Sequence, residues 1–117
     1  MSLDKKELIL LSNQIQGEGL LKKLVQQINK DSNLSGIDFN LNEDFALTTI
    51  ANELNELITD LIKNDFGSYL NFLYRIDVSE TDLIKIQETE LTDLSKKVTI
   101  LILKKEWQKI WFKNKSR

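Results

Sequence analysis

Hydrophobic residues recur along this chain with the spacing of amphipathic helices. The clearest example is residues 43–63, where the apolar positions follow an i, i+3, i+4 pattern and predict one helix. Asn42 suits the capping position before this helix, because its side chain can accept a hydrogen bond from a free backbone N–H. The stripe consists of Leu47, Ile50, Ala51, Leu54, Leu57, Ile58, Leu61 and Ile62.

The first thirty residues show the same spacing in two pieces. Helices are predicted over residues 4–16 and 20–30, and the closely spaced Gly17 and Gly19 disfavour one continuous helix. Residues 31–42 follow as a polar loop, since short polar side chains compete for backbone hydrogen bonds and Gly36 accepts positive φ.

Two shorter helices are predicted after residue 65. Residues 66–76 are apolar around most of the helix circumference, which predicts a helix buried on most sides at the centre of the core. Ser79 and Asp82 form a capping-box pattern, so a further helix is expected over residues 80–88.

The last predicted helix, residues 91–114, has more apolar positions than one packing face requires. One line contains Leu91, Leu94, Val98 and Leu101, with Ile102 beside it, and a second contains Ile100, Leu103, Trp107, Ile110 and Trp111. Either the helix runs through the middle of the bundle, or the second line is an interface, in which aromatic residues are common. We favour the interface, with these partner-binding residues: Leu103, Trp107, Ile110, Trp111, Lys104, Lys105 and Lys109.

Together these patterns predict an all-α fold: one domain over residues 1–117, a bundle of five to six helices with a long C-terminal helix. A length of 117 residues fits one domain, and 41% hydrophobic with 29% charged residues is typical of a globular chain. No apolar run approaches the roughly 20 residues of a transmembrane helix, and no signal-peptide pattern opens the chain. We therefore expect a cytoplasmic protein.

The amino acids that are missing restrict the chemistry. The chain has no Cys and no His, which excludes disulfides, thiolate metal sites and histidine acid–base catalysis. Residues 31–42 partly match a calcium-binding loop, but Asn42 stands where a bidentate Glu is needed, so a polar loop is the better interpretation. Glu53, Glu56 and Asp60 form an acidic row that we interpret as solvent-exposed. No enzyme activity, cofactor or metal is predicted.

Charge is strongly segregated despite a net charge of −2. Residues 31–93 carry fourteen acidic side chains against three basic ones, whereas residues 94–117 carry eight Lys and Arg against Glu106 alone. The favoured interpretation is that the basic helix lies against acidic faces of its own bundle. The alternative is that it reaches outward to nucleic acid, an anionic lipid surface or an acidic protein.

The segment Phe72-Leu-Tyr-Arg-Ile-Asp-Val-Ser-Glu80 resembles a segment of an uncharacterised group of short helical bacterial proteins. This resemblance covers the segment and the final helix, about a third of the chain. It implies an all-α fold and carries no activity.

The functional hypothesis is a non-catalytic protein-interaction module, with a homodimer joined through the C-terminal helix as the expected form. The alternative is a small binding protein that uses the basic, aromatic C-terminal helix on nucleic acid or anionic lipid.

Overall fold

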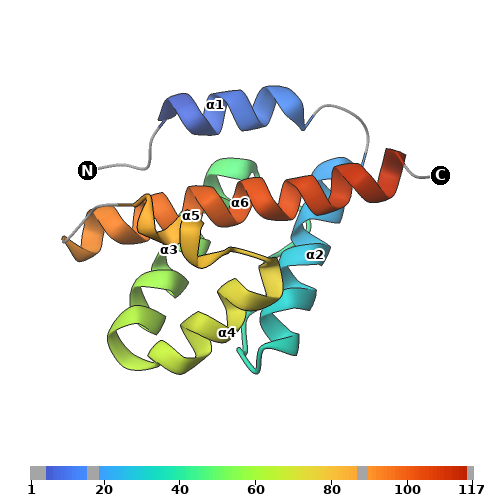
Figure 1. Cartoon of the computed structure of the whole chain (residues 1–117). Coiled ribbons are helices and arrows are strands. Elements are labelled where there is room, and N and C mark those ends of the chain that lie inside the picture. The colour runs from blue at the N-terminus through green and yellow to red at the C-terminus, as the bar shows by residue number, and fades with distance from the viewer. Residues whose placement is uncertain (1–4, 16–18, 87–89, 116–117) are drawn as a thin grey trace.

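The computed structural model describes residues 5–15, 19–86 and 90–115. In these ranges the chain forms six helices and no strand, so the predicted all-α fold with a long C-terminal helix is confirmed (Figure 1). The helices are α1 (Lys5–Gln14), α2 (Leu20–Leu34), α3 (Leu47–Asn64), α4 (Phe66–Ile76), α5 (Glu80–Ile84) and α6 (Leu91–Lys115).

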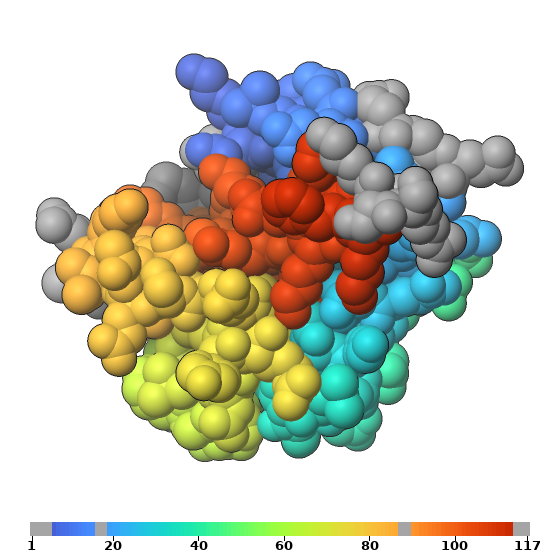
Figure 2. Space-filling view, turned by 45° about the vertical axis from the view of Figure 1, so that its right-hand side comes forward, coloured from blue at the N-terminus to red at the C-terminus, as the bar shows by residue number. Residues whose placement is uncertain are grey.

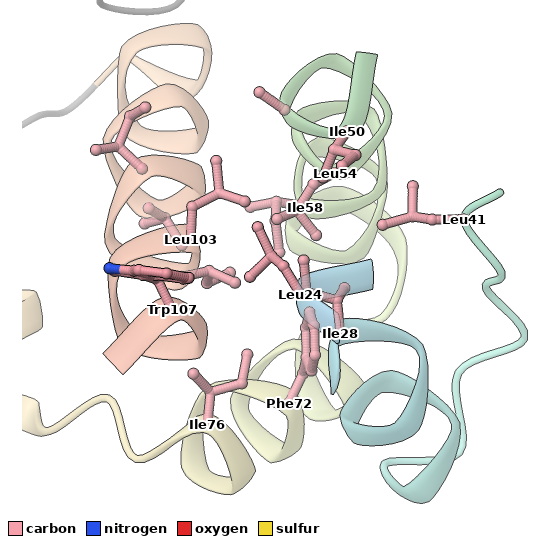
Figure 3. Close-up of a cluster of buried hydrophobic side chains, with 14 of the residues drawn as sticks. Leu24, Ile28, Leu41, Ile50, Leu54, Ile58, Phe72, Ile76, Leu103 and Trp107 are labelled. Atoms are coloured by element: carbon pink, nitrogen blue, oxygen red, sulfur yellow. The ribbon is translucent and has the colours of Figure 1, made fainter. Parts of the chain in front are cut away.

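The long helix α6 is the centre of the arrangement. It packs most extensively on α3 and also contacts α2, α4 and α1. In Figure 1 it runs across the molecule between α1 on one side and α4 on the other. Figure 3 shows Leu103 and Trp107 on α6, beside a cluster of side chains from three other helices. Those labelled side chains are Leu24 and Ile28 of α2, Ile50, Leu54 and Ile58 of α3, and Phe72 and Ile76 of α4.

Helix α3 begins at Leu47, four residues later than predicted. The Asn42 side chain accepts a hydrogen bond from the backbone N–H of Asp44 over 2.8 Å, which closes a local turn instead of capping a helix. Upstream, the Asn29 amide holds the backbone of Leu41 at both its N–H (2.7 Å) and its carbonyl (3.0 Å). With both of its backbone groups satisfied there, the segment stays extended against α2.

Helix α2 continues to Leu34, four residues into the segment predicted as a loop. Asp31 and Ser32 are therefore helical and buried, and the turn follows only at Ser35 and Gly36, where Gly36 has a φ of +82°. A helix cannot wrap alternate side chains around one ion, so the calcium-loop pattern has no structural counterpart in residues 31–34.

Helix α4 has the predicted bounds but is not buried on most sides. Tyr69, Phe72, Leu73 and Ile76 face the core, whereas Phe66, Leu70 and Tyr74 are exposed. The prediction that this helix is central is therefore wrong, because α6 occupies the middle and leaves α4 with a solvent-exposed face. The start of α4 is capped by Asp65, which accepts hydrogen bonds from the backbone N–H and the hydroxyl of Ser68.

The capping box at the start of α5 is present as predicted. Ser79 accepts a hydrogen bond from the Asp82 backbone N–H, and the Asp82 side chain accepts one from the Ser79 N–H. The helix ends at Ile84, earlier than expected, and residues 87 and 88 of the predicted range lie outside the described residues. Across the described ranges, no helix is long and apolar enough to cross a membrane.

Because Leu103 is fully buried where α6 meets three other helices, we expect Leu103→Ala to leave a cavity and lower the free energy of unfolding by about 3 kcal/mol. Leu10→Ala is the same chemical change at an exposed position and should cost less than about 1 kcal/mol. Urea unfolding followed by circular dichroism measures both, and equal losses would contradict the central position of α6.

Candidate interaction surface

The structure divides the predicted partner-binding residues of α6 into an inner and an outer group. Leu103, Trp107 and Ile110 are buried within the bundle, and Ile100 of the same apolar line is buried too. Trp111 is 44% exposed. Most of the second apolar line is therefore buried inside the protein. Of the predicted apolar contact residues, Trp111 remains at the surface.

The three lysines of the predicted set contact acidic side chains of other helices. Lys104 lies 2.6 Å from the Glu7 carboxylate of α1, and Lys105 lies 3.4 Å from Asp82 of α5. Lys109 Nζ lies 3.0 Å from an oxygen of Asp31 of α2. These contacts support the interpretation that the basic helix lies against acidic faces of its own bundle. The first two pairs are partly exposed, so each contributes little to stability.

A buried polar cluster joins α2 and α6 beneath these contacts. Asp31 and Glu106 are both buried, and Glu106 has no exposed surface. Asp31 Oδ2 accepts hydrogen bonds from Lys109 and from Gln27, each over 3.0 Å. The Lys109 ammonium also donates to the Arg75 carbonyl, which ties the end of α4 to the same point.

Glu106 is poorly supplied with hydrogen-bond donors. Neither of its carboxyl oxygens accepts a hydrogen bond, and Lys109 Nζ lies 3.7 Å from Oε1. A buried carboxylate without donors is costly, whereas a protonated carboxyl can donate its own hydrogen to the neighbouring Asp31. We conclude that Glu106 is held in its neutral form and that Asp31 carries the charge.

The acidities of the two groups agree with this assignment. Burial, together with the hydrogen bond and negative charge of Asp31, raises the pKa of Glu106 to about 9, against a weaker opposing effect of Lys109. Burial by itself would also raise the pKa of Asp31, but hydrogen bonds from Glu106, Gln27 and Lys109 outweigh it and lower that pKa. The pair thus shares one proton over the neutral pH range.

On the side of α6 that faces α1, a groove runs between α1 and the C-terminal half of α6. It contains two open hollows of about 220 and 380 Å³ that share Gln14, Trp107 and Gln108. Leu10 lines the first hollow and Trp111 the second. Figure 2 shows the C-terminal end of α6 at the surface, next to α1 and α2.

Phe112 extends the apolar surface beyond the groove. Its ring meets the Trp111 ring edge-on, with centroids 5.5 Å apart, and most of its side chain is exposed. Lys113 follows, and its ammonium donates to the Gln27 side chain over 2.8 Å. The end of α6 therefore presents two aromatic rings beside basic side chains that are already hydrogen-bonded within the fold.

The other acidic residues considered in the sequence do not gather into a site. Glu53, Glu56 and Asp60 lie on the exposed face of α3, as interpreted, and the Asp60 carboxylate accepts a hydrogen bond from Asn64. Within the described residues, no three acidic side chains lie close enough to hold a metal ion.

Sequence reasoning missed Glu106, although a signal for it exists. Glu106 lies at the i+3 position from Leu103 and directly before Trp107, so it shares the buried side of the helix. An acidic residue within the basic part of a helix, on its apolar side, indicates a buried partner. Asp31 offers no comparable signal, because the sequence places it at the start of a polar loop.

No family model, curated protein or solved structure matches this chain. Function must therefore be argued from the surface and the buried cluster themselves.

The free energy of unfolding should decrease as pH rises from about 5 to 9. In this range the folded chain keeps the Glu106 proton, whose pKa is about 9, while the unfolded chain releases it near pH 4.5. Glu106→Gln removes this titration and keeps a donor for Asp31, so the variant should be more stable than the natural chain by several kcal/mol at pH 8, at roughly 1.4 kcal/mol for each pH unit above the unfolded pKa.

Urea unfolding at several pH values measures this effect, with Glu53→Gln on the exposed face of α3 as the matched control. The control should keep the slope of the natural chain. An unchanged slope in Glu106→Gln would contradict a buried, neutral Glu106.

Proposed function

We propose that this chain is a non-catalytic protein-interaction module that contacts a partner polypeptide through the C-terminal end of α6 and the adjoining side of α1. The observation that supports this proposal is the exposure of Leu10 and Trp111, which line the two hollows of the groove, with the exposed Phe112 ring against Trp111. Single exposed apolar residues are ordinary, but apolar groups that line a hollow favour a contact with another chain.

Self-association through α6 is the form of contact expected from the sequence. Leu103, Trp107 and Ile110 are buried in the core. In the folded chain, self-association would therefore use Trp111, Phe112 and the groove beside Trp111. Aromatic side chains bury a large area at a low entropic cost, so two of them can anchor a modest interface.

The non-catalytic assignment rests on where the unusual ionisable groups lie. Glu106 and Asp31 share a proton as catalytic carboxyl pairs do, but neither lines the hollows beside α1. Their partners Gln27 and Lys109 connect helices of the core. A structural role in joining α2 to α6 accounts for each of these contacts.

The chain has two Trp residues, so Trp107→Phe leaves Trp111 as the single Trp, whose emission is excited selectively at wavelengths that Tyr does not absorb. We expect its emission to shift to shorter wavelength as the protein concentration rises from about 1 to 500 µM, because a partner copy removes water from the ring. Trp111→Phe, which retains buried Trp107, is the control and should show no shift.

Trp111→Lys should abolish this self-association and leave the helical circular dichroism spectrum unchanged. If the Trp111 emission is independent of concentration, self-association through this end is wrong. The groove would then need a different protein as its partner.

The basic, aromatic end of α6 also favours a second candidate, binding to nucleic acid or anionic lipid. Internal contacts of Lys104, Lys105 and Lys109 work against it, since each would have to exchange an acidic partner for a phosphate. We therefore expect weak binding, with a dissociation constant above about 100 µM at 150 mM NaCl.

Titration of a labelled single-stranded oligonucleotide and of phosphatidylglycerol vesicles, each at 50 and 300 mM NaCl, measures this binding. Tight binding that falls steeply with salt would favour the second candidate over the protein-interaction proposal.

A further inference from the structure

The extended segment between α2 and α3 resembles the edge strand of a β-sheet. Its side chains alternate, because Ile37 and Leu41 are buried and Phe39 is partly buried, whereas Asp38 and Asn40 are exposed. A period of two is typical of an extended chain that packs one face on the core. In Figure 3 the Leu41 side chain points from this segment toward the buried cluster.

Backbone groups of the three inward-facing residues are hydrogen-bonded to α2. The Ile37 N–H donates to the Ser32 carbonyl over 3.0 Å, and the Phe39 carbonyl accepts a hydrogen bond from the Ser32 hydroxyl over 3.4 Å. Further along, the Asn29 amide holds both backbone groups of Leu41. The segment is thus held extended before any partner binds, which lowers the entropic cost of binding.

The opposite edge of the segment, residues 37–42, is unpaired. Successive residues of an extended chain direct their backbone groups to opposite edges, so those of Asp38 and Asn40 point away from α2. Within the part of the chain that the structure describes, the backbone N–H and C=O of these two residues form no hydrogen bond. An unpaired edge of this kind is a template for pairing with another extended chain.

The charges around the edge indicate which kind of chain fits it. Asp38, Glu43 and Asp44 are exposed, and the sequence has no Lys or Arg between residues 31 and 62. Lys30 of α2 is also exposed and forms no ion pair with another described residue. Three acidic side chains against one basic side chain leave the edge negative. It therefore attracts a basic peptide and repels the same edge of a second copy.

We propose that residues 37–42 bind an extended, basic peptide segment of a partner protein, which adds as an antiparallel strand along the edge formed by Asp38 and Asn40. The inference goes beyond the proposed function, because it concerns a different surface. In Figure 3, α2 and α3 lie between this segment and α6.

The pairing defines the pattern of the peptide. In an antiparallel ladder, a residue exchanges two backbone hydrogen bonds with the residue opposite, and the two side chains lie on the same face. Peptide residues opposite Asp38 and Asn40 therefore have solvent-facing side chains, and a Lys or Arg there meets the Asp38 carboxylate. The peptide residue between them lies on the inner face beside Phe39, where a β-branched apolar side chain fits.

The probe for this site is a labelled seven-residue peptide that alternates Lys and Val and has both ends blocked. Fluorescence anisotropy with the full chain should show binding that saturates below about 1 mM protein. Methyl groups on three Lys backbone amides remove the hydrogens that face the protein, and this peptide should bind at least tenfold more weakly. Three methyl groups on the Val amides, which face solvent, should change the affinity less than twofold.

Two substitutions at one position test the edge from the side of the protein. Asn40→Pro removes the free N–H and places a ring at the edge, whereas Asn40→Ala keeps the N–H. Both variants lose the contact of the side chain with Asn33, so their difference isolates the backbone group. Asn40→Pro should bind the peptide at least tenfold more weakly and Asn40→Ala within twofold of the natural chain, with unchanged circular dichroism spectra.

Amide hydrogen exchange followed by nuclear magnetic resonance locates the bound peptide. In the free chain the Asp38 and Asn40 amides should exchange faster than the Leu41 amide, which donates to Asn29. Saturating peptide should slow the exchange of Asp38 and Asn40 at least tenfold.

An absence of binding, or equal binding of the two methylated peptides, would overturn the inference. Equal binding by Asn40→Pro and Asn40→Ala, or unchanged exchange at Asp38 in saturating peptide, would do the same. Trp111→Lys should bind the peptide like the natural chain. Loss of binding in that variant would place the peptide on α6 and contradict strand addition, whereas retained binding without self-association at Trp111 would contradict the self-association proposal alone.

Discussion

The structure depends on the burial of α6 by the helices around it. This one helix contacts α1, α2, α3 and α4, and so provides a surface that all four share, while α4 also packs on α3 and α2. Its two apolar lines are both needed, because partners lie on more than one side of it. Apolar side chains such as Val98, Ile102 and Leu103 are completely buried as a result.

A helix at the centre of a bundle must also accommodate its polar residues. Here the buried carboxyl of Glu106 is accommodated by a proton and by Asp31, while Lys109 neutralises the remaining charge and binds the end of α4. This cluster joins α6 to α2 and to the end of α4 at one point through directional hydrogen bonds. A buried polar cluster of this kind provides specificity of packing at some cost in stability.

The central position of α6 determines which surfaces are available for partners. Its apolar side chains are covered except toward the C-terminal end, which leaves Trp111 exposed beside α1 and Phe112 exposed next to Trp111. It also displaces α4 from the centre, and this leaves Phe66, Leu70 and Tyr74 exposed. The exposed apolar surfaces at the end of α6 and on α4 therefore both result from the central position of α6.

The sequence by itself determined which segments are helical, the α6 range and the cap at Ser79, because periodicity and capping are local properties of the backbone. Helix limits at Leu34 and Leu47 were not predictable, since the Asn29 amide holds Leu41 across twelve residues. Tertiary structure alone decided which apolar faces are covered. A sequence shows how much apolar surface a helix carries, but burial of that surface depends on which other helices reach it. For the same reason Trp107 is in the core and Trp111 is outside, although both belong to one apolar line.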